Sequence, residues 1–157
     1  MTSIQALATF GGAMALAGGL AGSAIGIANA ASSGVATLSE DSGQLRNVIV
    51  LASLPMTQSF YGLIILIIIL TVVLPKIAAA AGIGAGIGIL GIGIMAGFAE
   101  LFSAIFQGAV CASGIALLPK TKGRILTASM MLAVFVELIG VLGLVFTIMA
   151  LSILKLM

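Results

Sequence analysis

Histidine and tryptophan are absent from this chain of 157 residues, cysteine and tyrosine occur once each, and six basic and four acidic residues carry all the charge. Without histidine or a second cysteine, the sequence excludes histidine-based acid–base catalysis, Cys/His zinc sites and a disulfide within the chain. The formal net charge of +2 is too small and too scattered to indicate nucleic-acid binding.

Hydrophobic residues dominate what is present. They make up 62% of the chain and charged residues only 6%, whereas soluble domains carry roughly 25% charged residues. We therefore expect a single-domain, all-α membrane protein. Four apolar stretches each exceed the roughly 20 residues that cross a bilayer as a helix, and we expect them to form four transmembrane helices. They cover residues 4–37, 46–74, 77–118 and 125–154.

The two halves of the sequence resemble each other. Residues 23–38 (SAIGIANAASSGVATL) align with residues 103–118 (SAIFQGAVCASGIALL) at an offset of 80. The alignment predicts two tandem helical hairpins of the same orientation, a first repeat over about 4–75 and a second over about 77–157.

Glycine separates the four stretches into two kinds. The first and third carry glycines four residues apart, which let helices approach closely in lipid, whereas the second and fourth are filled with Leu, Ile, Val and Phe. We expect the first and third helices to pack against copies of themselves inside a homo-oligomeric ring, with the other two outside. The spaced glycines are Gly18-Gly22-Gly26, Gly84-Gly88 and Gly93-Gly97.

One glycine pattern is misleading. Residues 86–91 (GIGILG) match the G-x-G-x-x-G dinucleotide fingerprint. That fingerprint requires a preceding strand and a turn into a helix, but this segment lies inside an unbroken apolar stretch. We therefore expect no nucleotide site.

Basic residues predict the orientation in the membrane. Four flank the polar turns at 39–44 and 119–123, and two lie toward the other side. Because basic residues favour the cytoplasmic side, we expect the turns to be cytoplasmic and both termini to lie on the opposite side. The first four are Arg46, Lys120, Lys122 and Arg124, and the other two are Lys76 and Lys155.

Glu137 lies in the middle of the fourth stretch, where the repeat places Ser59 in the first half. An ionised carboxylate at the bilayer centre costs about 2.5–3.5 kcal/mol, and no Lys or Arg lies at that depth. Glu137 must therefore be protonated, paired or bound to a cation. The alternative to a functional site is a protonated glutamate whose only role is to hold neighbouring helices together by hydrogen bonds.

Three polar residues of the second stretch follow a proline. Thr57, Gln58 and Tyr61 share one broad helix face, and Pro55 removes an amide donor and predicts a kink with freed carbonyls. Oxygen groups of this kind suit a hard cation, although interhelical hydrogen bonding would also explain them. Gln107, which occurs only in the second half, would add another amide.

Three segments carry a resemblance to a known family. LPMTQSFYG (54–62), FQGAVCASGI (106–115) and VELIGVLG (136–143) resemble the four-helix rotor-ring proteolipid, subunit K, of V-type (V/A-type) ATPases, most closely the sodium-translocating bacterial form. The resemblance covers essentially the whole chain. It implies a Na+ site with Tyr61 hydrogen-bonded to the carboxylate. The implied ligands are the Leu54 carbonyl, Thr57, Gln58, Gln107 and Glu137.

Two residues depart from that pattern. Met56 stands where sodium-binding relatives commonly have glycine. Glu100 lies two turns before Gln107 on nearly the same helix face. Glu100 is interpreted as a protonated structural group or a residue lining the ring lumen, in preference to a second ion-coupled site.

The resemblance implies a rotor-ring subunit with no catalytic site of its own, which carries Na+ across the cell membrane by rotation coupled to ATP hydrolysis or synthesis in partner subunits. The implied partners are identical copies, a stator subunit with half-channels, central-stalk subunits at the cytoplasmic turns, and lipid.

Two alternatives stay open, a proton-specific ring and a small secondary ion-coupled transporter that uses Glu137. Sodium is favoured because a proton needs only the carboxylate, whereas Na+ needs several oxygen ligands.

Overall fold

The computed structural model describes residues 2–77 and 82–157, and every element in these ranges is helical. Four segments are long and apolar enough to span a membrane, which confirms the predicted all-α membrane fold. The spans are α1 (Ser3–Glu40), a composite second span (Ser42–Ile77), α5 (Ile83–Ala116) and α7 (Leu126–Ile153). The second span consists of η1 (Ser42–Gln44), α2 (Leu45–Ser53), η2 (Leu54–Met56), α3 (Thr57–Ile68), the π-helical η3 (Ile69–Val73) and α4 (Leu74–Ile77).

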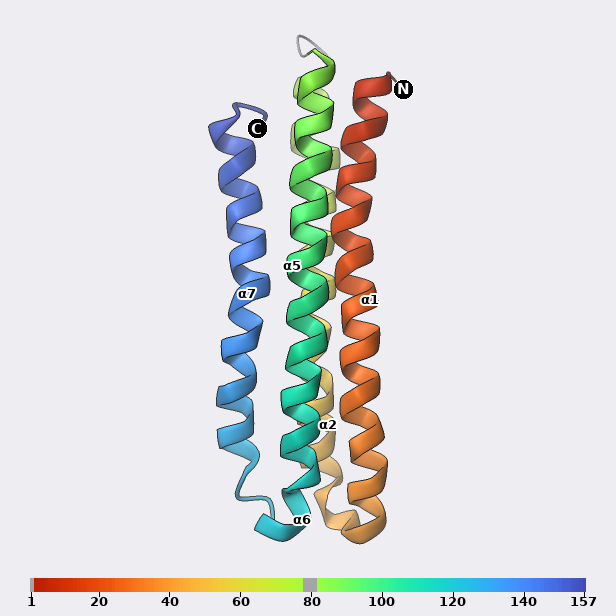
Figure 1. Ribbon diagram of the computed structural model, residues 1–157, viewed down its shortest axis with the longest axis vertical. Helices are drawn as coiled ribbons and strands as arrows, with labels where there is room; N and C mark the ends of the chain where they lie inside the picture. Colours follow the sequence, from red (N-terminus) through yellow and green to blue (C-terminus); the bar gives the residue numbers. More distant parts are fainter. Residues whose placement is uncertain (1, 78–81) are drawn as a thin grey trace.

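The four spans run side by side along the long axis of the molecule, with both termini at one end (Figure 1). The turn from α1 into α2 lies at the other end, together with the short helix α6 (Leu118–Thr121). At this second turn, Lys122 and Gly123 have φ of 52° and 79°. A Cβ on Gly123 would lie 2.9 Å from Asn47 Nδ2, so the two turns pack against each other.

The third predicted helix, 77–118, differs from the structure at both ends. Ile77 is the last residue of α4, and α5 begins at Ile83 after Gly82, whose backbone is extended (φ −69°, ψ 168°). At the other end, the Leu117 amide donates to the carbonyl oxygens of Gly114 and Ile115, and the separate helix α6 begins at Leu118, with Pro119 in its first turn. Residues 78–81, which the predicted range included, lie outside the described residues.

The glycine-rich helices α1 and α5 are the most buried spans, and they pack against each other within one chain. A Cβ on Gly18 would strike the backbone of Gly97, and one on Gly22 would lie 2.6 Å from the Leu101 carbonyl oxygen. These glycines were expected to face other copies of the chain. Their flat face is instead covered by the chain's own second hairpin, since close helix contact in lipid relies on small residues wherever it occurs.

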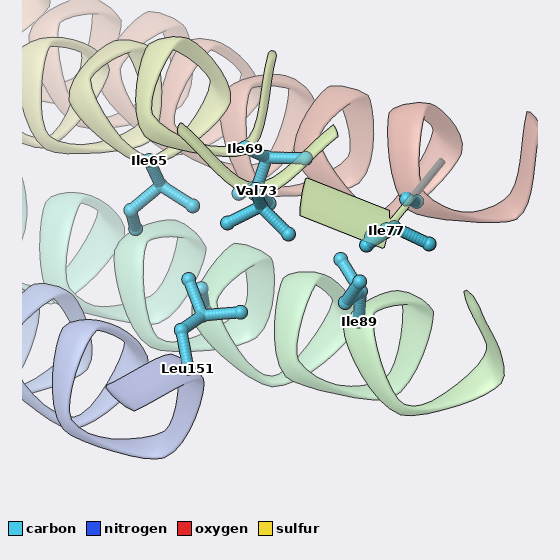
Figure 2. Close-up of a cluster of buried hydrophobic side chains, with 9 residues drawn as sticks. Ile65, Ile69, Val73, Ile77, Ile89 and Leu151 are labelled. Atoms are coloured by element: carbon cyan, nitrogen blue, oxygen red, sulfur yellow. The ribbon is translucent and has the colours of Figure 1, made fainter. Parts of the chain in front are cut away.

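Two apolar clusters fill the bundle, one toward each end. The cluster near the termini joins the second span, α5 and α7 through the side chains labelled in Figure 2, which are Ile65, Ile69, Val73, Ile77, Ile89 and Leu151. The cluster near the turns contains Val48, Leu51, Cys111, Ile115, Leu118 and Ala133. Along each of these three spans, the polar residues that the sequence analysis selected lie between the two clusters.

Candidate functional site

The backbone at Pro55 sets the start of the site. The expected kink is a 3₁₀ turn over Leu54–Met56, and the Thr57 amide donates to the Leu54 carbonyl oxygen. The Thr57 hydroxyl can donate to the same oxygen at 3.2 Å. The proline thus breaks the α-helical pattern and brings a backbone carbonyl and a hydroxyl together at the start of α3.

A continuous chain of hydrogen bonds leads from this turn to Glu137. Thr57 Oγ1 lies 3.2 Å from Gln58 Oε1 as well as from the Leu54 carbonyl oxygen, so its one proton can be donated to either acceptor. Gln58 Nε2 donates to Gln107 Oε1 at 2.9 Å. Gln107 Nε2 then donates to Glu137 Oε2 at 3.2 Å. The Tyr61 hydroxyl donates to Glu137 Oε1 at 2.9 Å. Residues from α3, α5 and α7 therefore meet in one polar layer.

This layer brings together all six residues that the sequence analysis selected. The side chains of Gln58 and Gln107 are fully buried, whereas Glu137 lies at the margin and is partly exposed. Each carboxylate oxygen of Glu137 accepts a hydrogen bond from a neutral donor. Such bonds stabilise a carboxylate more than they would a neutral acceptor, and they leave its charge uncompensated.

Ser103 is a member of the network that the sequence analysis did not select. It accepts a hydrogen bond from Gln58 Nε2 at 3.0 Å and donates to the Val136 carbonyl oxygen at 3.0 Å, beside Glu137. A signal was available, because Ser103 lies four residues before Gln107 and hence on the same helix face. In the alignment of the two halves, Ser103 corresponds to Ser23, and this correspondence alone does not indicate a role in the site.

Glu100 is enclosed between α5 and α7. Its side chain has no exposed surface, and within the described part of the chain neither carboxylate oxygen has a hydrogen-bond partner. A Cβ on Gly140 would lie 2.7 Å from Glu100 Oε2, and one on Gly143 would lie 3.4 Å from Oε1. The interpretation of Glu100 as a lumen-lining residue is therefore wrong, because the side chain points into its own chain against α7.

The equivalent position of the first hairpin has different chemistry. The Ser59 hydroxyl donates to Ser23 Oγ at 2.8 Å, so the two hydroxyls of this hairpin bond to each other. By the repeat, Ser23 corresponds to Ser103 and Ser59 to Glu137. Within residues 2–77 and 82–157, the two similar hairpins therefore share one hydrogen-bonded polar layer that contains a carboxylate.

Two tandem membrane hairpins around an interior carboxylate define the class of this protein as a duplicated membrane proteolipid. The family model for the C subunit of ATP synthase matches the chain twice, at residues 10–69 and 90–150. One match falls in each half. The chain belongs to this family of ATP synthase C subunits.

Two curated relatives are similar over most of the chain. The A-type ATP synthase subunit K of Methanocaldococcus jannaschii is 37% identical over 147 residues, which cover 91% of this chain and 63% of the relative. The V-type sodium ATPase subunit K of Enterococcus hirae is 31% identical over 124 residues, or 79% of this chain and 76% of the relative. This chain thus spans less than two thirds of the M. jannaschii protein.

Proposed function

We propose that this chain is a rotor-ring subunit of a V/A-type rotary ATPase that binds a cation at Glu137 and carries it across the cell membrane as the ring turns. The observation that carries the proposal is the hydrogen-bonded layer that joins α3, α5 and α7 around that carboxylate. Family membership supports assembly with identical copies and with other ATPase subunits.

The proposed cargo is Na+. Alkali cations take oxygen ligands, and the polar layer offers a carboxylate with neutral oxygens close by. The name of the E. hirae relative, a sodium ATPase subunit, also supports sodium. The proposed ligands are the Leu54 carbonyl, Thr57 Oγ1, the side-chain oxygens of Gln58 and Gln107, and Glu137. Tyr61 would hold the carboxylate in position from the side of α3.

Charge neutralisation would couple ion binding to rotation. Moving an empty, ionised Glu137 into the lipid phase would cost about 2.5–3.5 kcal/mol. A bound cation would lower this cost because it neutralises the carboxylate. The partial exposure of Glu137 lets a neighbouring stator subunit with half-channels reach it. In this proposal the stator supplies the basic partner, central-stalk subunits contact the two polar turns on the cytoplasmic side, and ATP chemistry takes place in other subunits.

The test is carbodiimide labelling of the chain in its native membrane complex, with sodium chloride or with choline chloride as the matched control. We expect labelling at Glu137 that sodium suppresses, because a bound cation would occupy the carboxylate. Equal labelling in both salts would support a proton-specific ring. Modification of Glu100 in place of Glu137 would contradict the assigned site.

The size of the protein in mild detergent separates the rotor from a transporter. A large, stable homo-oligomer is the result that the rotor requires. A monomer or dimer that still transports sodium after reconstitution would support the secondary transporter.

A further inference from the structure

Glu100 is a buried polar group that the proposed ion site does not use. Its side chain has no exposed surface, and both of its carboxyl oxygens are without a hydrogen-bond partner among the described residues. A carboxyl group buried without a charged partner is neutral, because burying its ionised form would be costly. A neutral carboxyl group carries an O–H that can donate one hydrogen bond. Glu100 therefore has a donor that needs an acceptor.

Ser103 has an acceptor position to spare. A serine hydroxyl donates one hydrogen bond and can accept two. The Ser103 hydroxyl donates to the Val136 carbonyl oxygen at 3.0 Å and accepts from Gln58 Nε2 at 3.0 Å. Within the part of the chain that the structure describes, this oxygen therefore has one lone pair left to accept a further bond.

The donor and the spare acceptor lie beside each other. Glu100 and Ser103 are three residues apart in α5, which places them on one face of the helix. Both reach the same point on α7, since a Cβ on Gly140 would lie 2.7 Å from Glu100 Oε2 and 3.2 Å from Ser103 Oγ. A rotation of the Glu100 side chain, with both helices in place, would bring its O–H to Ser103.

We propose that Glu100 is a neutral carboxylic acid that donates a hydrogen bond to Ser103 Oγ and thereby acts as a positioning residue for the ion site. Ser103 passes the effect to the amide of Gln58. The two protons of Gln58 Nε2 go to Ser103 Oγ and Gln107 Oε1, so the amide oxygen is left on the side of Thr57 Oγ1, 3.2 Å away. A firmly held Ser103 would keep that oxygen oriented toward the cation.

This inference rests on the proposed ion site and adds one residue to its support. The positioning role is separable from the packing of the side chain between α5 and α7. Methionine is unbranched and adaptable, so Glu100→Met fills the same space without a donor. Glu100→Gln fills it and keeps an N–H donor. Packing alone predicts that both variants behave alike, whereas a hydrogen bond to Ser103 predicts that only Glu100→Gln behaves like the parent protein.

Infrared difference spectroscopy of the assembled complex tests the hydrogen bond without relying on sodium transport. In a Glu137→Gln background, subtracting the spectrum of the variant that also carries Glu100→Gln isolates the Glu100 carboxyl group. We expect the C=O stretching band of a protonated carboxylic acid. Ser103→Ala should move this band to higher frequency, because the O–H loses its acceptor. Ser23→Ala, the corresponding change in the first hairpin, is the matched control and should leave the band in place.

Two infrared results would overturn the proposal. One is a carboxylate band at Glu100 in place of the acid band. The other is an acid band that Ser103→Ala leaves unmoved, which would mean that the proton is donated elsewhere. Either result would leave the rotor function standing.

The positioning role is measured by the sodium concentration that half-protects Glu137 from carbodiimide in the complex. Glu100→Met should raise this concentration about two- to tenfold, the range that one neutral hydrogen bond covers, whereas Glu100→Gln should match the parent protein. In a Ser103→Ala background, adding Glu100→Met should raise it no further, because residues that act through one shared bond are not additive.

Equal half-protection of Glu100→Met and the parent protein would overturn the positioning role. Independent, additive losses in the double variant would overturn it as well. A parent protein that sodium does not protect at all would contradict the proposed sodium site instead, and the infrared band would still decide whether Glu100 donates to Ser103.

Discussion

The two carboxyl groups inside the membrane spans lie in opposite surroundings. Glu137, at the edge of the polar layer, accepts hydrogen bonds from Tyr61 and Gln107 and is partly exposed. Glu100, about two turns away along α5 from Gln107, is fully buried, and its oxygens have no hydrogen-bond partner within the described residues. The same type of side chain therefore occupies an open, hydrogen-bonded position in one place and, in the other, a closed position with no hydrogen-bond partner among the described residues.

The difference bears on which carboxyl would exchange the proposed ion. A cation site needs ligands that are already oriented and a path by which the ion enters and leaves. Glu137 has oriented partners on two neighbouring helices and an exposed edge. Glu100 is closed in by α7, where Gly140 and Gly143 provide the space for its carboxyl group. This comparison supports the proposal that Glu137 exchanges the ion and that Glu100 has a packing role.

The largest effect is expected from Glu137→Gln. The amide keeps the shape but removes the negative charge that neutralises a cation, so sodium uptake by the reconstituted complex should fall to background. Uptake of radioactive sodium measures this. Glu100→Gln is the matched control and should transport sodium like the parent protein. Loss of transport in Glu100→Gln with retention in Glu137→Gln would reverse the two roles.

Gly140→Ala should destabilise the chain by about 1–3 kcal/mol, the usual cost of adding a methyl group to a packed interior. The new Cβ would lie 2.7 Å from Glu100 Oε2. Unfolding in detergent measures the change in the free energy of unfolding. In a double-mutant cycle with Glu100→Ala, part of the cost should disappear because the nearest contact is gone, while the contacts at 3.2 Å with Gln58 Cγ and Ser103 Oγ remain. An undiminished cost in the double variant would show that the clash lies elsewhere.

Tyr61→Phe should weaken sodium binding about ten- to hundredfold. Hydrogen bonds to charged groups contribute about 1.5–3 kcal/mol, and every 1.4 kcal/mol is about tenfold in affinity. The sodium concentration that half-protects Glu137 from carbodiimide measures the affinity. Unchanged half-protection would mean that the phenol plays no part in holding the carboxylate.

The smallest effect is expected from Ser103→Ala. Gln58 Nε2 keeps its bond to Gln107 and loses one acceptor. Since a neutral hydrogen bond contributes about 0.5–1.5 kcal/mol, sodium affinity should fall about two- to tenfold. Ser23→Ala, the corresponding change in the first hairpin, is the control and should leave the affinity unchanged. Equal losses in both variants would point to a general loosening of the bundle.

The sequence predicted the helices and the proximity of the polar residues, because both follow from local rules. Long apolar runs can cross a membrane only as helices. A carboxylate inside the membrane needs polar side chains or an ion beside it. The residues Thr57, Gln58 and Gln107 could therefore be grouped with Glu137 before their distances were known.

What the sequence could not predict is which neighbour each helix face meets. Helical periodicity places Glu100, Ser103 and Gln107 on one side of α5, but it does not say whether that side faces a lumen, a neighbouring copy or α7. For the same reason, the glycines of α1 were expected between copies, although they lie within the chain. The third helix was predicted to begin at residue 77, whereas α5 begins at Ile83, because an Ala/Gly-rich run has the hydropathy of a continuous span.

The polar layer has a further consequence, since it draws its parts from both repeats. Thr57, Gln58 and Tyr61 come from the first hairpin, whereas Gln107 and Glu137 come from the second. Neither half alone retains a complete set. A chain that contained only one of the two hairpins would therefore lack part of this layer.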